Sequence, residues 1–310
     1  IASVACASGM AALTNAFLNI LQSGDEIVSS AGLYGGSIDL FRDLETFGIT
    51  TKYVETNNWE QIEAAIGEHT KLIFAETIAN PGLTVTNIEK MSEIAHNHGV
   101  PLIVDNTTAT PYLIQVLKHG ADIVVNSSSK YMNGSSNAIS GILTDGGKFK
   151  WDRKKYPGIS DYVKYGPMAF VAKLRNGIFR NTGACLSPVN AYLNLIGIET
   201  LGLRMECECQ NALELAHWIA ENYSDIIVNY PGLESSKYYT LADKMFQRGY
   251  GAIVTVRVGS KEKAYKIIDA LKIPYILANI GDTKTLVIHP ESTIATHLSD
   301  IEKQQSGVYE

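Results

Sequence analysis

The chain lacks several features that define common classes of protein. Its 310 residues contain no run of about 18 apolar residues, which a membrane-crossing helix needs. Cysteine is scarce, and its four copies form no CxxC pair, so disulfides and a zinc site are both disfavoured. Neither GxGxxG nor a Walker sequence occurs, which argues against a nicotinamide-dependent dehydrogenase and against a nucleoside triphosphate ligand.

The chain also lacks an excess of basic charge. Lys and Arg total 26 against 32 for Asp and Glu, which gives a formal charge of −6. A nucleic-acid partner is therefore not expected. With 45% hydrophobic and 19% charged residues, the composition is typical of a compact globular protein. Reduced cysteines and the absence of a membrane span predict a cytoplasmic location.

The first residues, 1–8, have the pattern of a buried strand and no charged segment, so no signal peptide is expected. A start within a strand pattern, without Met, leads us to expect further residues upstream.

Residues 1–145 alternate short β-branched runs with amphipathic stretches. This pattern predicts βαβ units around a mostly parallel sheet with both faces buried. Strands are expected at residues 1–7, 26–29, 50–54, 72–76, 102–105, 123–126 and 139–143. Helices are expected near residues 9–21, 37–47, 59–66 and 88–98.

The second half of the chain predicts a smaller α+β domain. Residues 146–167 have a basic cluster and are expected to form a surface insertion. Residues 188–222 predict one long helix, broken near Gly197 and Gly202. Strands near 226–228, 252–258 and 285–288 and a helix over 261–271 follow, and the polar end, 300–310, contains no predicted element. The predicted domains are residues 1–187 and 188–310.

The most informative segment follows the strand at 123–126, where three serines precede Lys130. Ligands of open α/β folds usually bind at the carboxyl edge of the sheet, which is where these side chains would lie. A lysine can form a Schiff base with a carbonyl compound such as pyridoxal phosphate. Ser127 and Ser129 are suitably placed for its phosphate, although an ordinary solvated loop remains an alternative.

Two further strand ends point to the same edge. Asp105 ends one strand, where its carboxylate could pair with a pyridinium nitrogen or simply cap a turn. Ser8, Gly9 and Met10 open a helix, whose free N–H groups and positive dipole end suit a phosphate. Three converging strand ends favour a site for a phosphorylated cofactor.

Several motifs, in this order, resemble the Cys/Met-metabolism family of pyridoxal-phosphate enzymes of fold type I. They are Ser8-Gly9-Met10, Leu33-Tyr34-Gly35-Gly36, Glu76 to Pro81, Val104 to Thr107 and Ser127 to Tyr131. Motifs at 183–188, 197–201, 230–235 and 279–290 resemble the O-acetylhomoserine sulfhydrylase branch most closely. The resemblance covers essentially the whole chain and implies a seven-stranded, mostly parallel sheet sandwiched by helices.

The resemblance implies pyridoxal 5′-phosphate as cofactor and a role for each matching residue. Lys130 would hold it as an internal aldimine and move protons, and Asp105 would pair with its ring nitrogen. Tyr34 would stack on the ring and act on the leaving group, Asn80 would approach the ring hydroxyl, and Asn279 would contact substrate. Phosphate binding is implied for Ser8, Gly9, Met10, Ser127 and Ser129. Glu76 is expected to support its loop rather than perform chemistry.

The implied reaction is γ-replacement, in which O-acetyl-L-homoserine and sulfide or a thiol give L-homocysteine or methionine and acetate. Methionine γ-lyase or a cystathionine γ-synthase or γ-lyase activity remains an alternative, although Gly36 replaces a Cys typical of methionine γ-lyases. The family also implies a homo-oligomer, expected to be a dimer of dimers, with the site at a subunit interface.

The chain departs from the family pattern at Asn126 and Ser135, where His is usual, and at Ser129, where Thr is usual. The family's N-terminal arm and its C-terminal segment with a carboxylate-binding Arg do not occur in this chain. A catalytically incompetent cofactor-binding fragment therefore remains a further alternative. His96 and His98 close a helix and lack a third ligand, so no metal site is expected.

Overall fold

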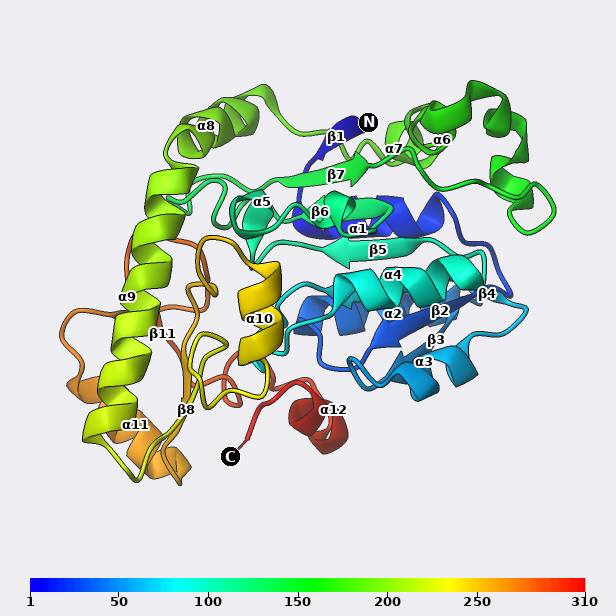
Figure 1. The fold of residues 1–310 in the computed structure, drawn as a ribbon. Helices are drawn as coiled ribbons and strands as arrows, with labels where there is room; N and C mark the ends of the chain where they lie inside the picture. The colour runs from blue at the N-terminus through cyan, green and yellow to red at the C-terminus, as the bar shows by residue number, and fades with distance from the viewer. Residues whose placement is uncertain (310) are drawn as a thin grey trace.

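The central sheet is mostly parallel, as predicted. The computed structural model describes residues 1–309, and within them seven strands form this sheet in the order β1-β7-β6-β5-β4-β2-β3 (Figure 1). The strands are β1 (Ala2–Cys6), β2 (Glu26–Ser30), β3 (Thr50–Val54), β4 (Thr70–Glu76), β5 (Leu102–Asp105), β6 (Ile123–Asn126) and β7 (Gly141–Asp145). Only β7 runs antiparallel to its neighbours, β1 and β6.

Helices cover both faces of the sheet, and β4 shows why. Its residues alternate between two buried hydrophobic clusters, because successive side chains of a strand point to opposite faces. The covering helices are α1 (Gly9–Leu18), α2 (Gly35–Thr46), α3 (Trp59–Ala65) and α4 (Ile88–Asn97). Leu72 and Phe74 pack with α1 and α2, whereas Ile73 and Ala75 pack with α3 and α4.

The long helix predicted over 188–222 is divided in two. Thr200 separates α8 (Pro188–Glu199) from α9 (Leu201–Asn222), so the break lies between the two glycines that predicted it. Figure 1 shows α9 running along one side of the molecule towards α11.

The remaining elements are shorter. They are α5 (Thr110–Leu113), η1 (Val116–Lys118), η2 (Pro157–Met168), α6 (Ala169–Asn176), α7 (Ile178–Thr182), β8 (Ile227–Asn229), α10 (Tyr239–Met245), β9 (Thr255–Arg257), α11 (Lys261–Ala270), β10 (Tyr275–Ile276), β11 (Leu286–Val287) and α12 (Asp300–Gln305). β8 pairs with β9 and β10 pairs with β11, away from the central sheet.

One prediction about an irregular segment is wrong. The polar end contains α12, which begins with a capping box between Ser299 and Glu302. The segment 146–167 is mostly exposed or half-buried, as expected of a surface insertion, but Tyr156 is buried and its hydroxyl donates to the carbonyls of Lys71 and Gly99 at 3.0 and 3.2 Å. Its aromatic side chains anchor the segment to the edge of the sheet.

No helix among residues 1–309 is long and apolar enough to cross a membrane.

Candidate active site

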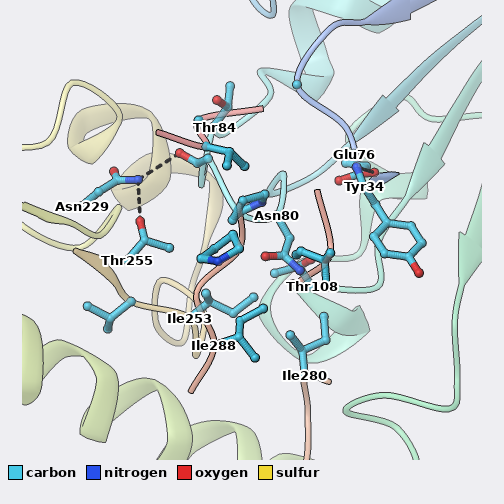
Figure 2. A pocket seen from close by; sticks show the side chains of 18 of the residues that line it. Tyr34, Glu76, Asn80, Thr84, Thr108, Asn229, Ile253, Thr255, Ile280 and Ile288 are labelled. Carbon is cyan, nitrogen blue, oxygen red and sulfur yellow. Dashed lines mark hydrogen bonds between the residues drawn. The ribbon is translucent and has the colours of Figure 1, made fainter. Parts of the chain in front are cut away.

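The carboxyl ends of β1, β4, β5 and β6 meet at one edge of the sheet and open into a cavity of about 2250 Å³. Figure 2 shows Asn80 and Thr108 between Tyr34 on one side and Ile253 and Ile288 on the other. The structure brings every predicted site residue to this cavity: Ser8, Gly9, Met10, Tyr34, Asn80, Asp105, Ser127, Ser129, Lys130 and Asn279.

Lys130 lies in a tight turn just after β6. Its backbone N–H donates to the Ser127 carbonyl at 3.2 Å, and its own carbonyl accepts from the Gly134 N–H at 2.9 Å. Its Nζ donates to Oδ1 of Asn279 at 2.5 Å. Burial lowers the pKa of the Lys130 amine below its usual value, which favours the neutral form that attacks carbonyl carbon.

Asp105 ends β5 with its carboxylate in the cavity. Its Oδ1 accepts the Thr107 N–H at 2.8 Å, so the turn cap suggested by the sequence is present. Burial nevertheless raises the pKa of Asp105 to about 6. A cationic group beside this carboxylate would offset the desolvation, and a protonated ring nitrogen is such a group.

Glu76 ends β4 and supports two loops, as predicted. Its Oε1 accepts the Tyr34 N–H at 2.7 Å, and the carboxylate also accepts the Asn80 N–H. Burial, together with the nearby Asp105 carboxylate, raises the pKa of Glu76 well above its usual value. Glu76 thereby places the Tyr34 ring, which is 45% exposed, within reach of the cavity.

The N-terminus of α1 forms a cradle for an anion. The side chain of Ser8 caps the helix by accepting the Ala11 N–H at 2.9 Å, while the N–H groups of Gly9 and Met10 have no acceptor within the helix. A Cβ at Gly9 would lie 2.6 Å from the Cβ of Ser127. Only glycine therefore lets the helix start approach Ser127 so closely.

Ser129 lines the cavity, and its hydroxyl bonds to the backbone of Ser140. Its hydroxyl donates to the Ser140 carbonyl at 2.9 Å and accepts the Ser140 N–H at 2.8 Å. A hydroxyl has one proton, and here that proton is given to the chain just before β7. The expected phosphate contact of Ser129 would require the hydroxyl to turn away from Ser140.

Sequence reasoning assigned no role to two residues of the site, Thr107 and Ser136. Thr107 donates its N–H to Asp105, and its Oγ1 accepts the Ser127 N–H at 2.7 Å, so it joins two strand ends. Ser136 accepts from Nδ2 of Asn279 at 2.7 Å and donates to Asp282 at 2.6 Å. The only local signal for Thr107 was its place after Asp105-Asn106, and the Ser136 contacts join segments distant in the sequence.

The histidines and cysteines form no metal site within residues 1–309. His96 instead pairs with Asp122, with 2.8 Å between Nε2 and Oδ2. Cys207 is exposed and Cys209 is buried, so their sulfurs lie on different faces of α9 as expected.

The family model of Cys/Met metabolism PLP-dependent enzymes matches residues 1–310. The chain belongs to this family. O-acetyl-L-homoserine sulfhydrylase of Leptospira meyeri is 40% identical to it over 99% of this chain and 74% of its own length.

Two solved structures of sulfur-metabolism enzymes are similar to this member of the family. One, described as an O-acetylhomoserine (thiol)-lyase of Campylobacter jejuni, has a TM-score of 0.91 and 34% identity over 99% of this chain and 76% of its own. It contains N′-pyridoxyl-lysine-5′-monophosphate. The other, O-acetylhomoserine sulfhydrylase of Wolinella succinogenes, has a TM-score of 0.87 and 41% identity over 95% of this chain and 85% of its own.

As a PLP-dependent enzyme, the protein uses pyridoxal 5′-phosphate, and the chemistry of the cavity fits this group. The Lys130 amine suits its aldehyde, and the buried Asp105 suits a cationic ring nitrogen. The start of α1, beside Ser127, suits its phosphate.

Replacing Gly9 by alanine is expected to weaken cofactor binding. The added Cβ would force α1 away from Ser127, and loss of one hydrogen bond to a charged phosphate should raise Kd about 10-fold or more. Titration of the cofactor-free protein with pyridoxal phosphate, followed by absorbance, measures this change. Gly67→Ala is the control, because a Cβ there meets its nearest neighbours at an ordinary 3.7 Å. Equal affinity of the Gly9→Ala variant and the wild type would contradict the phosphate assignment.

Proposed function

We propose that the protein catalyses γ-replacement on O-acetyl-L-homoserine, with sulfide or a thiol as the second substrate, to give L-homocysteine or methionine and acetate. The observation that carries the proposal is the Lys130 amine, which lies with Asp105 at one sheet edge in a member of a PLP-dependent family. The names of relatives about 40% identical over the whole chain support the choice of substrate.

The proposed mechanism assigns each step to a side chain of the cavity. Bound pyridoxal phosphate supplies an electron sink that makes the α-hydrogen of an amino acid acidic. Asp105, as a carboxylate, would pair with the ring nitrogen and favour its protonated state. The Lys130 amine would hold the cofactor and would carry protons between Cα and the following carbons of the substrate.

Tyr34 is proposed to pack on the cofactor ring and to act towards the leaving group. Burial and the charges of Glu76, Asp39 and Asp105 raise the pKa of its phenol above the usual value of tyrosine, so the hydroxyl keeps its proton at neutral pH. With its backbone N–H bound to Glu76, Tyr34 can donate its phenolic proton to the departing acetate. Asn279 is proposed to contact the substrate after its bond to Lys130 opens.

We also propose that the enzyme is a homo-oligomer with the site near the subunit interface. Side chains of α8 form an exposed apolar face, with Val189, Tyr192 and Leu195 each more than 60% exposed. This face continues to the cavity, because Asn190 donates to the carbonyl of Ile139, an exposed residue that lines it. A second copy would bury this face, and the mass in solution by light scattering tests the assembly.

In this proposal residues 1–187 bind the cofactor and residues 188–310 form the smaller domain. The proposed location is the cytoplasm, in keeping with four free cysteines within the described chain.

The cofactor assignment is tested first by absorption. The purified protein with pyridoxal phosphate is expected to show an absorption band at about 420 nm that borohydride removes. Peptide mapping should then place the reduced adduct on Lys130. An adduct on another lysine, or no band, would refute the assignment.

The reaction is tested by acetate release from O-acetyl-L-homoserine with and without sulfide. Replacement predicts homocysteine formation that depends on sulfide. Formation of a 2-oxo acid and ammonia without sulfide would instead show a γ-lyase type of elimination. Cofactor binding without any turnover would favour the incompetent fragment.

A further inference from the structure

Arg204 stands in the first turn of α9 and binds backbone carbonyls rather than carboxylates. Its Nη1 donates to the Tyr131 carbonyl at 2.7 Å, and its Nη2 donates to the carbonyls of Gly197 and Met132 at 2.7 and 3.4 Å. Its Nε donates to Oγ1 of Thr200 at 3.0 Å. The planar fork of a guanidinium suits such multiple contacts.

These contacts join the segment that carries Lys130 to the junction of α8 and α9. Tyr131 and Met132 follow Lys130 directly, and Tyr131 is 2% exposed. Gly134, with φ +73°, gives the guanidinium room, because a Cβ there would collide with it. The turn after Lys130 therefore packs directly against the Arg204 guanidinium.

Within residues 1–309 the guanidinium of Arg204 forms no ion pair. Glu208 lies one turn further along α9, but neither of its carboxylate oxygens has a hydrogen-bond partner among residues 1–309. Burial raises the pKa of Glu208 to about 7, and the charge of Arg204 opposes this rise. The carbonyl dipoles of the Lys130 turn and of the end of α8 thus stabilise the guanidinium. With these bonds made, Arg204 is not available as a ligand for a substrate carboxylate.

We propose that Arg204 is a positioning residue for Lys130. Arg204 binds the Tyr131 and Met132 carbonyls and thereby fixes the position of the Lys130 amine in the cavity. The inference rests on the proposed function, in which Lys130 is the cofactor lysine. The lysine stem is flexible, so the place of its amine depends on the turn from which it projects. A misplacement of 1 Å at a reacting group can cost about 100-fold in rate.

The test compares Arg204→Met and Arg204→Lys in the cofactor-loaded enzyme. Methionine keeps an unbranched stem but removes the charge and every donor, whereas lysine keeps the charge and can restore part of the bonding. Without substrate, we expect Arg204→Met to bind cofactor but to lose most of the circular dichroism of the cofactor band. Its kcat should fall about 100-fold with KM near the wild-type value. Arg204→Lys should recover part of both signals.

Controls separate positioning from general stability. Arg153→Met removes one exposed positive charge and should leave dichroism and kcat unchanged. Thermal unfolding of each cofactor-free variant measures the loss of stability alone. Wild-type dichroism and kcat in Arg204→Met would overturn the inference, and so would a lowered melting temperature with normal dichroism. If Arg204→Met does not fold, Arg204→Lys decides by the same two signals. Failure of wild-type protein in the borohydride test would refute the proposed function instead.

Discussion

Replacing Lys130 by alanine is expected to abolish turnover, with kcat reduced on the order of 10⁴-fold or more. The physical reason is that, in the proposed mechanism, Lys130 supplies both the amine that binds the cofactor and the proton carrier of the later steps. The borohydride-stable adduct should disappear with the activity. Initial rates of homocysteine formation and mass spectrometry of the reduced protein measure the two losses.

The chain offers a matched control in Lys155. Burial lowers the pKa of this amine too, but its Nζ donates to the His98 carbonyl at 2.8 Å, away from the cavity. Lys155→Ala should therefore retain both activity and adduct. Full activity in the Lys130→Ala variant would exclude the mechanism.

Replacing Asp105 by asparagine is expected to change activity and stability in opposite directions. In the proposed mechanism the carboxylate is the counter-charge of the cofactor ring, so its loss should lower kcat about 10²–10³-fold. The cofactor-free Asp105→Asn variant, however, should be more stable than the cofactor-free wild type above pH 6. Asp105 of the wild type has a pKa of about 6 when folded and 3.8 as its ordinary value. The folded state therefore binds more protons between these values, and stability falls as pH rises through this window.

The asparagine variant avoids this loss, so its gain at pH 7.5 should be on the order of 3 kcal/mol. Urea unfolding of cofactor-free wild type and variant at pH 4.5 and 7.5 measures it. Asp145→Asn is the control, since burial also raises the pKa of Asp145 to about 6 but its side chain lies at the end of β7, on the opposite edge of the sheet. It should show the stability gain without the loss of kcat. A destabilised or fully active Asp105→Asn protein would contradict the prediction.

The residues that the sequence made predictable lie where a strand ends. Lys130 and Asp105 follow β-branched runs, and the carboxyl ends of parallel strands meet at one edge whatever the details of packing. The hydrogen-bond partner of Ser129 depended on how the chain before β7 approaches the turn after β6, which no local pattern specifies.

Contacts across long sequence separations were likewise beyond prediction. The bond of Arg204 to the Tyr131 carbonyl spans 73 residues and has no periodic signal. The helix at the end of the chain was missed for another reason. Ser299 and Glu302 have the spacing of a capping box, but no apolar run follows that would mark a helix.

In β4 and in β5, a residue of the hydrophobic core is followed directly by a residue of the site. Ala75 is a core residue and Glu76 holds the loop of Tyr34; Val104 is likewise in the core and Asp105 faces the cavity. Core packing and the chemistry of the site thus depend on separate, adjacent positions. Substitutions at and beyond each strand end can change the reaction, while the core residues one position earlier continue to stabilise the same fold.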